Sequence, residues 1–304
     1  MKERRTMKPS SPRNILLLLL TAMIWGSAFV AQSAGMDYVG PYTFLAFRSY
    51  LGGAVLVIYL LLTRGKPSGT EIPPKDRKTL MLGGICCGAA LFVASALQQI
   101  GVMYTTVSKS GFLTAMYILI VPFLSLLLFR RRLPGLIWVC VGLSLAGMYL
   151  LCLSGPVGFT FGDGMVLLCA VGYSVHILVV DRFSSKADPV LLSCIQFFVC
   201  AVMLTAPMLV WEHPAPTDIA PAWLTVGYAG IFSSGVGYTL QTVAQRDCDP
   251  TICSLVLCLE SVFSALFGWL LLGQGLSLRE SAGCVLMFAA IVLSQLPRKS
   301  AVPG

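Results

Sequence analysis

The chain has 304 residues, of which 57% are hydrophobic and 11% are charged, and its mean hydropathy is +0.83. Soluble domains carry about 25% charged residues, so this composition excludes a soluble globular protein. The formal net charge of +8 comes from basic residues placed between apolar stretches. That placement indicates membrane topology and contact with lipid headgroups, not nucleic-acid binding.

Ten apolar stretches are long enough to form membrane-spanning helices, each of which needs about 20 residues. In the first half of the chain we expect spans at 14–32, 41–62, 80–97, 110–129 and 135–153. In the second half we expect spans at 164–180, 189–210, 222–241, 251–272 and 276–296. The short connections leave no room for a soluble domain, so the sequence predicts an all-α integral membrane protein with ten transmembrane helices.

Lysine and arginine predict the orientation of these spans. Eighteen of the 21 basic residues fall on one face of the predicted topology, and the exceptions are Arg48, Lys109 and Arg279. By the positive-inside rule this face is cytoplasmic. We therefore expect a multi-pass protein of the plasma membrane with cytoplasmic tails at 1–13 and 297–304.

The two halves of the chain resemble each other, which predicts an internal duplication. Pro41 and Arg48 are matched 148 residues later by Pro189 and Gln196, and other pairs include Ser27 with Ser174 and Gln98 with Gln241. Repeats at 14–153 and 164–296 would each hold five spans. Because five is odd, the second repeat would enter the membrane from the opposite face, as in carriers that bind their substrate near the bilayer midplane.

Arg48 is the most informative polar residue inside a predicted span. It lies seven residues into the second span, about 10 Å below the boundary at 1.5 Å per residue. An ionisable group at that depth costs roughly 2.5 to 3.5 kcal/mol even on the insertion scale that penalises it least. Two interpretations stay open: Arg48 contacts an anionic group of the substrate, or it forms a structural pair with a carboxylate or with backbone carbonyls.

A carboxylate lies almost midway along the ninth span, at Glu260. Its helix face continues with small residues, which is typical of helix packing or of a cavity lining. Glu260 is therefore a candidate for proton coupling, with a fixed bond to Arg48 or to a hydroxyl group as the alternative.

Other polar and aromatic residues recur at helical spacing within the spans. Thr21, Trp25, Ala28 and Gln32 share one face of the first span, and Tyr173 and His176 share one face of the sixth. Such faces suit an amphipathic solute, although ordinary packing explains part of the pattern. The candidates for a substrate or ion pathway are Trp25, Arg48, Gln98, Tyr117, His176, Gln196, Tyr238, Gln241 and Glu260.

The sequence gives no indication of a cofactor, a metal or a catalytic centre. Eleven cysteines are present, but almost all lie inside predicted spans, where we expect them to act as small apolar residues without disulfides. The loop 211–221 holds Glu212, His213 and Asp218 among prolines, and we interpret it as a solvated connection. No phosphate-binding loop follows a strand, which excludes a fused ATPase.

The motifs of the whole chain resemble the ten-span EamA branch of the drug/metabolite transporter superfamily. They are WGSAFVAQ at 25–32, PYTFLAFR at 41–48, FLTAMYILIVPFLSLLL at 112–128, GDGMVLLCAVGYS at 162–174 and LESVFSALFGWLLLGQGLS at 259–277. The resemblance implies inverted five-helix repeats, a central cavity and peripheral fifth and tenth helices. It departs where the family often has "lgE" and "E-P", because this chain has Gln274 and the pair Glu260 and Ser261.

From these features we expect a secondary transporter that exports a small metabolite, amino acid or drug-like solute by alternating access. Its partners would be that solute and the lipid bilayer, with proton coupling, exchange coupling and a homodimer left open. A non-transporting scaffold or sensor is the alternative. A membrane-embedded enzyme is less favoured, because the chain lacks clustered acids, bases and metal ligands.

Overall fold

The computed structural model describes residues 11–63, 77–105, 107–129, 133–152, 159–272 and 277–294. Within these ranges the chain is helical and contains no strand. Within the described residues, eight helical stretches, some made of more than one helical segment, are long and apolar enough to cross a membrane. The chain is therefore an all-α membrane protein, and the predicted fold class is confirmed. Gln274, the side chain of Lys109 and most of both predicted tails lie outside the described residues.

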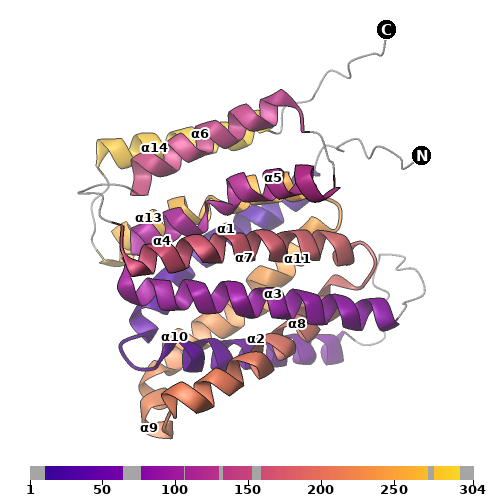
Figure 1. Ribbon diagram of the computed structural model, residues 1–304, viewed down its shortest axis with the longest axis vertical. Coiled ribbons are helices and arrows are strands. Elements are labelled where there is room, and N and C mark those ends of the chain that lie inside the picture. The colour runs from indigo at the N-terminus through magenta and orange to yellow at the C-terminus, as the bar shows by residue number, and fades with distance from the viewer. Residues whose placement is uncertain are drawn as a thin grey trace.

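Figure 1 shows how the helices of the two halves are arranged. The first half comprises α1 (Pro12–Gly35), α2 (Pro41–Leu62), α3 (Arg77–Tyr104), α4 (Val107–Thr114), α5 (Tyr117–Phe129) and α6 (Gly135–Cys152). The second half begins with α7 (Phe161–Ser184), α8 (Pro189–Pro207), η1 (Met208–Glu212), α9 (Pro216–Ile219) and η2 (Ala220–Ala222). It continues with α10 (Trp223–Tyr228), η3 (Ala229–Gly237), α11 (Tyr238–Gln245), α12 (Pro250–Leu257), α13 (Glu260–Leu272) and α14 (Leu278–Ser294).

Local sequence signals explain where several helices begin. Helices α1, α2, α8 and α12 each start with proline, which suits the first helical position because the N–H that it lacks has no intrahelical partner there. Helix α7 starts with a capping box, in which the Thr160 side chain and the Asp163 side chain each accept from the other's backbone N–H. The start of α7 at Phe161 lies a few residues before the predicted start at 164, whereas α2 and α8 begin at the predicted prolines.

The packing of the helices follows an approximate two-fold relation between the repeats. Helix α2 packs against α8 and α6 against α14, and α5 of the fourth span packs against α12 of the ninth, so equivalent spans meet. The remaining contacts come in equivalent pairs, since α3 packs on α7 while α1 packs on η3 and α11. This pattern is what two inverted five-helix repeats produce.

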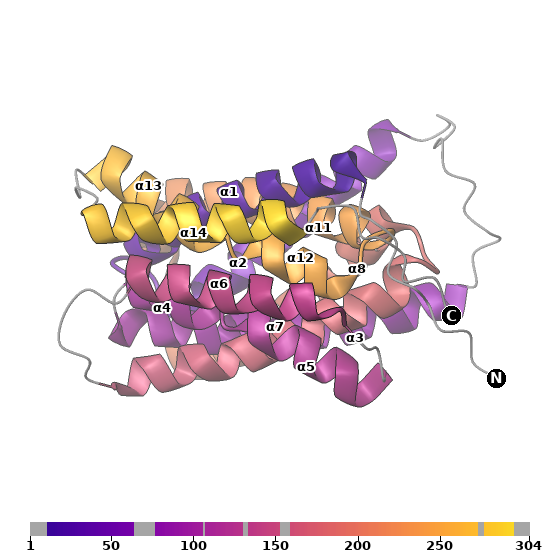
Figure 2. The same cartoon turned by 90° about the horizontal axis from the view of Figure 1, so that it is seen from above.

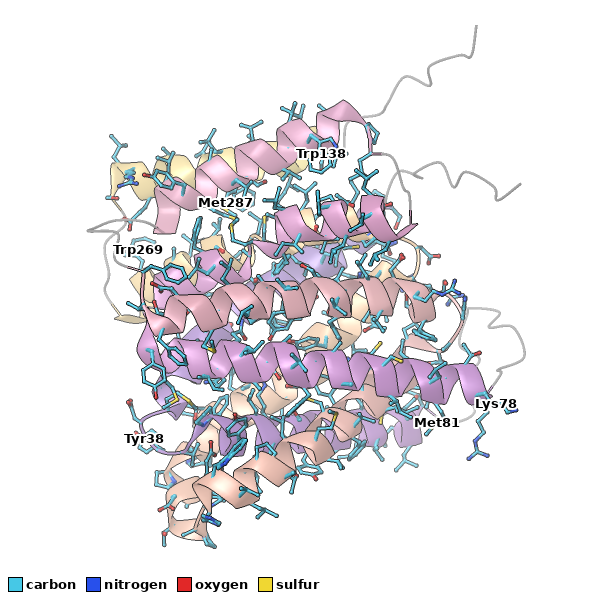
Figure 3. The ribbon with its side chains drawn as sticks, viewed as in Figure 1. Tyr38, Lys78, Met81, Trp138, Trp269 and Met287 are labelled. Carbon is cyan, nitrogen blue, oxygen red and sulfur yellow. The ribbon has the colours of Figure 1, made fainter. Side chains whose placement is uncertain are left out.

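The fifth helix of each repeat lies outside the main bundle. Helices α6 and α14 lie at one end of the molecule in Figure 1, and Figure 2, which looks down on that end, shows them side by side, as the resemblance implied. They approach closely because Gly147 faces the backbone of Gly283 and the side chain of Met287. Met287 is fully buried and points into this contact (Figure 3).

The sides of the bundle are apolar and exposed, as a lipid-facing surface must be. Met81, Trp138 and Trp269 lie on the outside of α3, α6 and α13 and have at least a third of their surface exposed (Figure 3). Tyr38 and Lys78 mark opposite ends of the bundle (Figure 3), so the helices run from one membrane face to the other between these residues.

Four of the predicted spans are not continuous α-helices. The fourth is divided into α4 and α5, and the ninth into α12 and α13. The seventh passes from α8 into the π-helical segment η1, and the eighth contains the π-helical segment η3 between α10 and α11. Hydropathy averaged over a span does not register a local change of hydrogen-bond period, so the sequence predicts the spans without these interruptions.

Candidate functional site

A cavity lies between the two repeats, and its empty space, together with the solvent at its opening, amounts to about 450 Å³. Side chains from α1 to α5 and from α7, η3, α11 and α13 face it. Its lining residues are Trp25, Phe29, Gln32, Arg48, Gln98, Thr114, Tyr117, Tyr173, His176, Ile177, Ser233, Tyr238, Gln241 and Glu260. Eight of the nine candidate residues from the sequence thus line one cavity, and only Gln196 does not.

Arg48 is 6% exposed and its guanidinium reaches from α2 across the cavity to the other repeat. Its Nε donates to the hydroxyl of Ser234 at 3.1 Å and its Nη2 to the hydroxyl of Ser233 at 3.1 Å, while its Nη1 donates to Gln32 Oε1 at 3.2 Å. These acceptors are neutral. The possible pairing of Arg48 with Glu260 is not formed, because Glu260 binds Tyr117 instead.

The π-helical winding of η3 explains why two consecutive serines reach Arg48. A regular α-helix turns neighbouring side chains about 100° apart, whereas the wider π-helix brings an additional residue onto a given face. Ser234 lies four residues before Tyr238, so α-helical spacing predicts that the two share a face, whereas Ser233 lies five residues before Tyr238 and is not predicted on that face. Ser233 was therefore missed in the sequence, and it lies on the cavity because of the local winding.

Glu260 and Tyr117 hold equivalent positions at the two helix breaks. Each is the first residue of the second helical segment, α13 and α5 respectively, and they are 143 residues apart in the chain. The Tyr117 hydroxyl donates to Glu260 Oε1 at 3.0 Å, and Glu260 is 3% exposed. A carboxylate in the first turn of a helix is stabilised by the positive end of the helix dipole.

A chain of hydrogen bonds crosses the cavity from α11 to α4. The Tyr238 hydroxyl donates to the Tyr173 hydroxyl at 3.4 Å, and Tyr173 donates to Gln98 Oε1 at 3.0 Å. Gln98 Nε2 then donates to the Thr114 hydroxyl at 3.1 Å. Both atoms of the Gln98 amide are therefore satisfied within the protein.

Gln196 lies behind the cavity and not in its lining. It is fully buried, and its Oε1 lies 3.1 Å from His176 Nε2. Because an amide oxygen only accepts, this contact places the His176 proton on Nε2. The prediction that Gln196 lines the pathway as the counterpart of Arg48 is thus not reproduced by the geometry; its side chain orients His176, which does line the cavity.

Aromatic rings form the apolar part of the lining. The rings of Trp25 and Tyr238 are 4.5 Å apart between centroids, and Trp25 Nε1 donates to the Ser233 carbonyl at 3.4 Å. His176 meets the edge of Tyr238 at 5.8 Å. These rings present flat apolar surface beside the polar groups, which suits a solute with both kinds of surface.

Some lining residues gave no signal in the sequence. Phe29 and Ile177 look like ordinary apolar helix residues, and Thr114 became recognisable only through its bond to Gln98. Gln32 and Tyr173 lie on the helix faces that the spacing identified. Nothing in a single sequence separates a cavity-lining phenylalanine from a packed one.

A second inter-repeat contact lies at the end of the bundle near α9. The carboxylate of Glu212 accepts from the backbone N–H groups of Tyr42 and Thr43 at 2.8 and 2.7 Å, so it caps the N-terminus of α2. The carboxylate fits closely against Gly40, where a Cβ would overlap it. The expectation that Glu212 belongs to a merely solvated loop was therefore wrong.

An all-α membrane fold of two repeats around one central cavity is the architecture of a small-solute transporter. The family comparison agrees, because EamA-like transporter family matches cover residues 12–153 and 160–296. The chain belongs to the EamA-like transporter family. Since the members of this family are transporters, the alternative of a membrane-embedded enzyme is set aside.

Several relatives are similar along most of the chain. An uncharacterized transporter of Archaeoglobus fulgidus is 27% identical over 92% of this chain and 84% of its own length. The S-adenosylmethionine/S-adenosylhomocysteine transporter of Chlamydia muridarum is 25% identical over 86% and 85%, and the inner membrane transporter YedA of Escherichia coli K12 is 24% identical over 90% and 88%. A solved crystal structure superposes with a TM-score of 0.75 at 19% identity, over 93% and 97% of the two chains. The protein is thus a membrane transporter of a small solute.

Proposed function

We propose that the protein is a secondary transporter that exports a small amphipathic organic solute by alternating access. The observation that carries this proposal is the cavity to which both repeats contribute and at which two spans are interrupted. Discontinuous helices at a repeat interface form the substrate sites of carriers of this type, because the freed backbone groups and helix ends can contact the solute.

Arg48 supplies the contact for an anionic group of the solute. A guanidinium carries five N–H donors, and the three neutral acceptors at Gln32, Ser233 and Ser234 each use one of its nitrogens. Among the described residues, no carboxylate lies within the 4.0 Å of an ion pair with it. The charge of Arg48 is therefore held in place but not neutralised, which favours an anion at the cavity.

Glu260 supplies the second ionisable group of the cavity. Its Oε1 accepts from Tyr117, and this leaves Oε2 to face either a cationic group of the solute or a proton. In the proposed mechanism this carboxylate binds the proton or the cationic group in one open state and not in the other. This difference would couple transport to protons or to exchange.

Alternating access requires the repeats to separate at one end while they close at the other. The Glu212 contact joins the repeats at the end near Tyr42, and it would have to break when that end opens. We place this end outside the cell, and the end near Lys78 in the cytoplasm of a plasma-membrane protein with cytoplasmic termini. Fusions of alkaline phosphatase and of a fluorescent protein to the C-terminus test this: only the fluorescent fusion should be active.

Counterflow in proteoliposomes tests the carrier function. Purified protein is reconstituted with S-adenosylmethionine, amino acids, nucleosides or sugar phosphates inside, and uptake of the labelled solute is followed. The S-adenosyl compound is the first probe because a relative transports it by name. Accumulation that requires internal unlabelled solute is expected for a carrier. Stabilisation by a solute without any exchange would contradict transport and favour a sensor or scaffold.

A matched pair of variants ties the transport to the cavity. Arg48→Gln removes the charge from the lining, and we expect it to abolish counterflow of an anionic solute in folded protein. Tyr50→Phe changes a hydroxyl on the exposed side of the same helix and should leave counterflow unchanged. Equal activity of both variants would exclude the role of Arg48.

A further inference from the structure

One amide in the cavity has no hydrogen-bond partner among the described residues. The side chain of Gln241 on α11 is fully buried and lines the cavity. Both its Oε1 and its Nε2 are without a bond to any residue that the structure describes. Buried amides are normally paired, because the loss of hydration is otherwise not compensated.

The equivalent amide in the first repeat is fully paired. Gln98 precedes Gln241 by 143 residues, the same separation that relates the two helix breaks. Its Nε2 donates to Thr114 at 3.1 Å and its Oε1 accepts from Tyr173 at 3.0 Å. The two glutamines thus occupy equivalent places in the bundle and differ only in whether the protein satisfies them.

The repeat comparison shows why Gln241 lacks partners. Thr114 is the last residue of α4, and the last residue of α12 is Leu257, which has no hydroxyl. Tyr173 precedes Ser174, and the residue that precedes the matching Ser27 is Gly26. Both positions that would pair with the Gln241 amide have lost their hydrogen-bonding side chain.

The surroundings of Gly26 and Leu257 leave no hydrogen-bonding side chain at either position. Gly26 packs so closely against α13 that a Cβ there would overlap the Phe263 side chain and the Glu260 backbone. Leu257 is fully buried and apolar. Gln241 therefore brings to the cavity lining an amide whose acceptor and donor groups are unused within the described residues, about one turn along α11 from Tyr238 and its contact with Trp25.

We propose that Gln241 is a specificity-determining residue of the transporter and binds a planar solute edge on which an acceptor adjoins an N–H donor. A carboxamide and the amino edge of adenine share this chemistry, and glutamine pairs with both atoms of such an edge. The ring surfaces of Trp25 and Tyr238 lie beside it for the planar group. This inference rests on the proposed function and names the substrate class of the same cavity.

Thermal unfolding of the purified full chain with matched probes tests the substrate class. Adenosine is compared with purine riboside, which lacks the amino group, and nicotinamide with nicotinic acid, which lacks the amide N–H. At millimolar concentration we expect adenosine or nicotinamide to raise the midpoint temperature by mass action, and its matched control to raise it much less. The pair that responds distinguishes a nucleobase from a carboxamide.

Two variants separate recognition from structure. Gln241→Met removes an unpaired buried amide, so the midpoint temperature of the ligand-free protein should rise by roughly 2–4 °C. The further rise that the active probe causes in the wild-type protein should be lost. Gln98→Met breaks two internal bonds and should lower the midpoint. A rise of the midpoint in Gln241→Met together with a fall in Gln98→Met is the result expected if the Gln241 amide serves the ligand and the Gln98 amide serves the structure.

Two results would overturn the inference. If Gln241→Met melts lower, as Gln98→Met does, the amide has an internal structural role. If no probe stabilises the wild-type protein more than its matched control, the substrate class is wrong. A probe that binds through Gln241 but shows no counterflow would support the recognition site and contradict only the proposed transport function.

Discussion

The two repeats are most directly compared at their helix breaks, which lie between α4 and α5 in the first repeat and between α12 and α13 in the second. In both, the backbone changes to i to i+3 hydrogen bonds at equivalent residues: Met116 to Leu113 in the first repeat and Leu259 to Val256 in the second. The segment that follows starts with Tyr117 in one repeat and with Glu260 in the other, and these side chains bind each other. The duplication has therefore kept the backbone geometry while the cavity-facing chemistry has diverged into a donor and an acceptor.

The same divergence separates Arg48 from Gln196. Both lie seven residues after the proline that begins their helix, but Arg48 crosses to the serines of η3 whereas Gln196 stays within its own repeat on His176. Arg48 therefore contributes to the connection between the repeats at the cavity, beside the Tyr117–Glu260 and Tyr173–Gln98 bonds, and Gln196 does not.

The largest effect is expected for Arg48→Met. It leaves Gln32, Ser233 and Ser234 without their donor, and hydrogen bonds to a charged group contribute about 1.5–3 kcal/mol each. Part of this is offset because the buried charge is removed, so we expect a net loss on the order of 3 kcal/mol. Thermal unfolding followed by tryptophan fluorescence in detergent measures it.

The control for this variant is Gln196→Met in the equivalent place. It removes a single neutral bond to His176, so its cost should be about 1 kcal/mol. Equal costs for the two variants would show that Arg48 contributes no more to the connection between the repeats than its counterpart does.

The next effect concerns the pair at the helix breaks. Glu260→Gln keeps the size of the side chain but cannot exchange a proton, so counterflow should lose its dependence on pH and its rate should fall about tenfold, which corresponds to 1.4 kcal/mol. Tyr117→Phe removes only the donor and should preserve the pH dependence. An unchanged pH profile in Glu260→Gln would show that this carboxylate carries no proton in transport.

The N-termini of α2 and α8 offer a third comparison. Helix α8 is capped by its own Asp188, which accepts from Val190 and Leu191. In α2 the equivalent residue is Gly40, and the cap comes from Glu212 of the other repeat. One helix start is thus stabilised locally, whereas the other is stabilised only while the repeats are closed at that end.

Glu212→Ala should therefore act on conformation as well as on stability. We expect a loss of about 1–2 kcal/mol, typical of a lost helix cap, together with faster hydrogen exchange of the first turn of α2. The control Asp188→Ala removes a cap within one repeat and should raise exchange only in α8. Exchange that rises equally at both helices in each variant would contradict a cap that depends on repeat closure.

Much of this architecture could be predicted because the membrane imposes strong rules. Apolar stretches must form helices there, and costly polar groups such as Arg48 and Glu260 must avoid lipid and converge. For this reason the duplication, the spans and eight of the cavity-lining residues follow from hydropathy and spacing. Gln196 shows what such rules do not predict. It lies as deep in its helix as Arg48 does, but its side chain contacts His176 and does not line the cavity.

The remaining features depend on contacts between residues distant in sequence. No glycine or proline lies at the breaks before Tyr117 and Glu260, so the local sequence did not indicate them. The π-helical winding that turns Ser233 toward Arg48 has no compositional signal either. Glu212 caps a helix start 170 residues away, and only the packing of the repeats brings the two together.

The smallest effect is expected at a polar contact on the outer side of α2 and α8. The Tyr50 hydroxyl lies 3.0 Å from the Thr205 hydroxyl, whereas the equivalent pair in the opposite repeats is Phe198 and Val57. Tyr50→Phe makes this position alike in both repeats. Because interhelical hydrogen bonds in membranes average about 0.6 kcal/mol, the midpoint of unfolding should shift only slightly and Thr205→Val should add little more. The two hydroxyls belong to α2 and α8, which meet between the repeats. A much larger fall of the midpoint in either variant would therefore mean that this contact connects the repeats as strongly as the polar contacts at the cavity do.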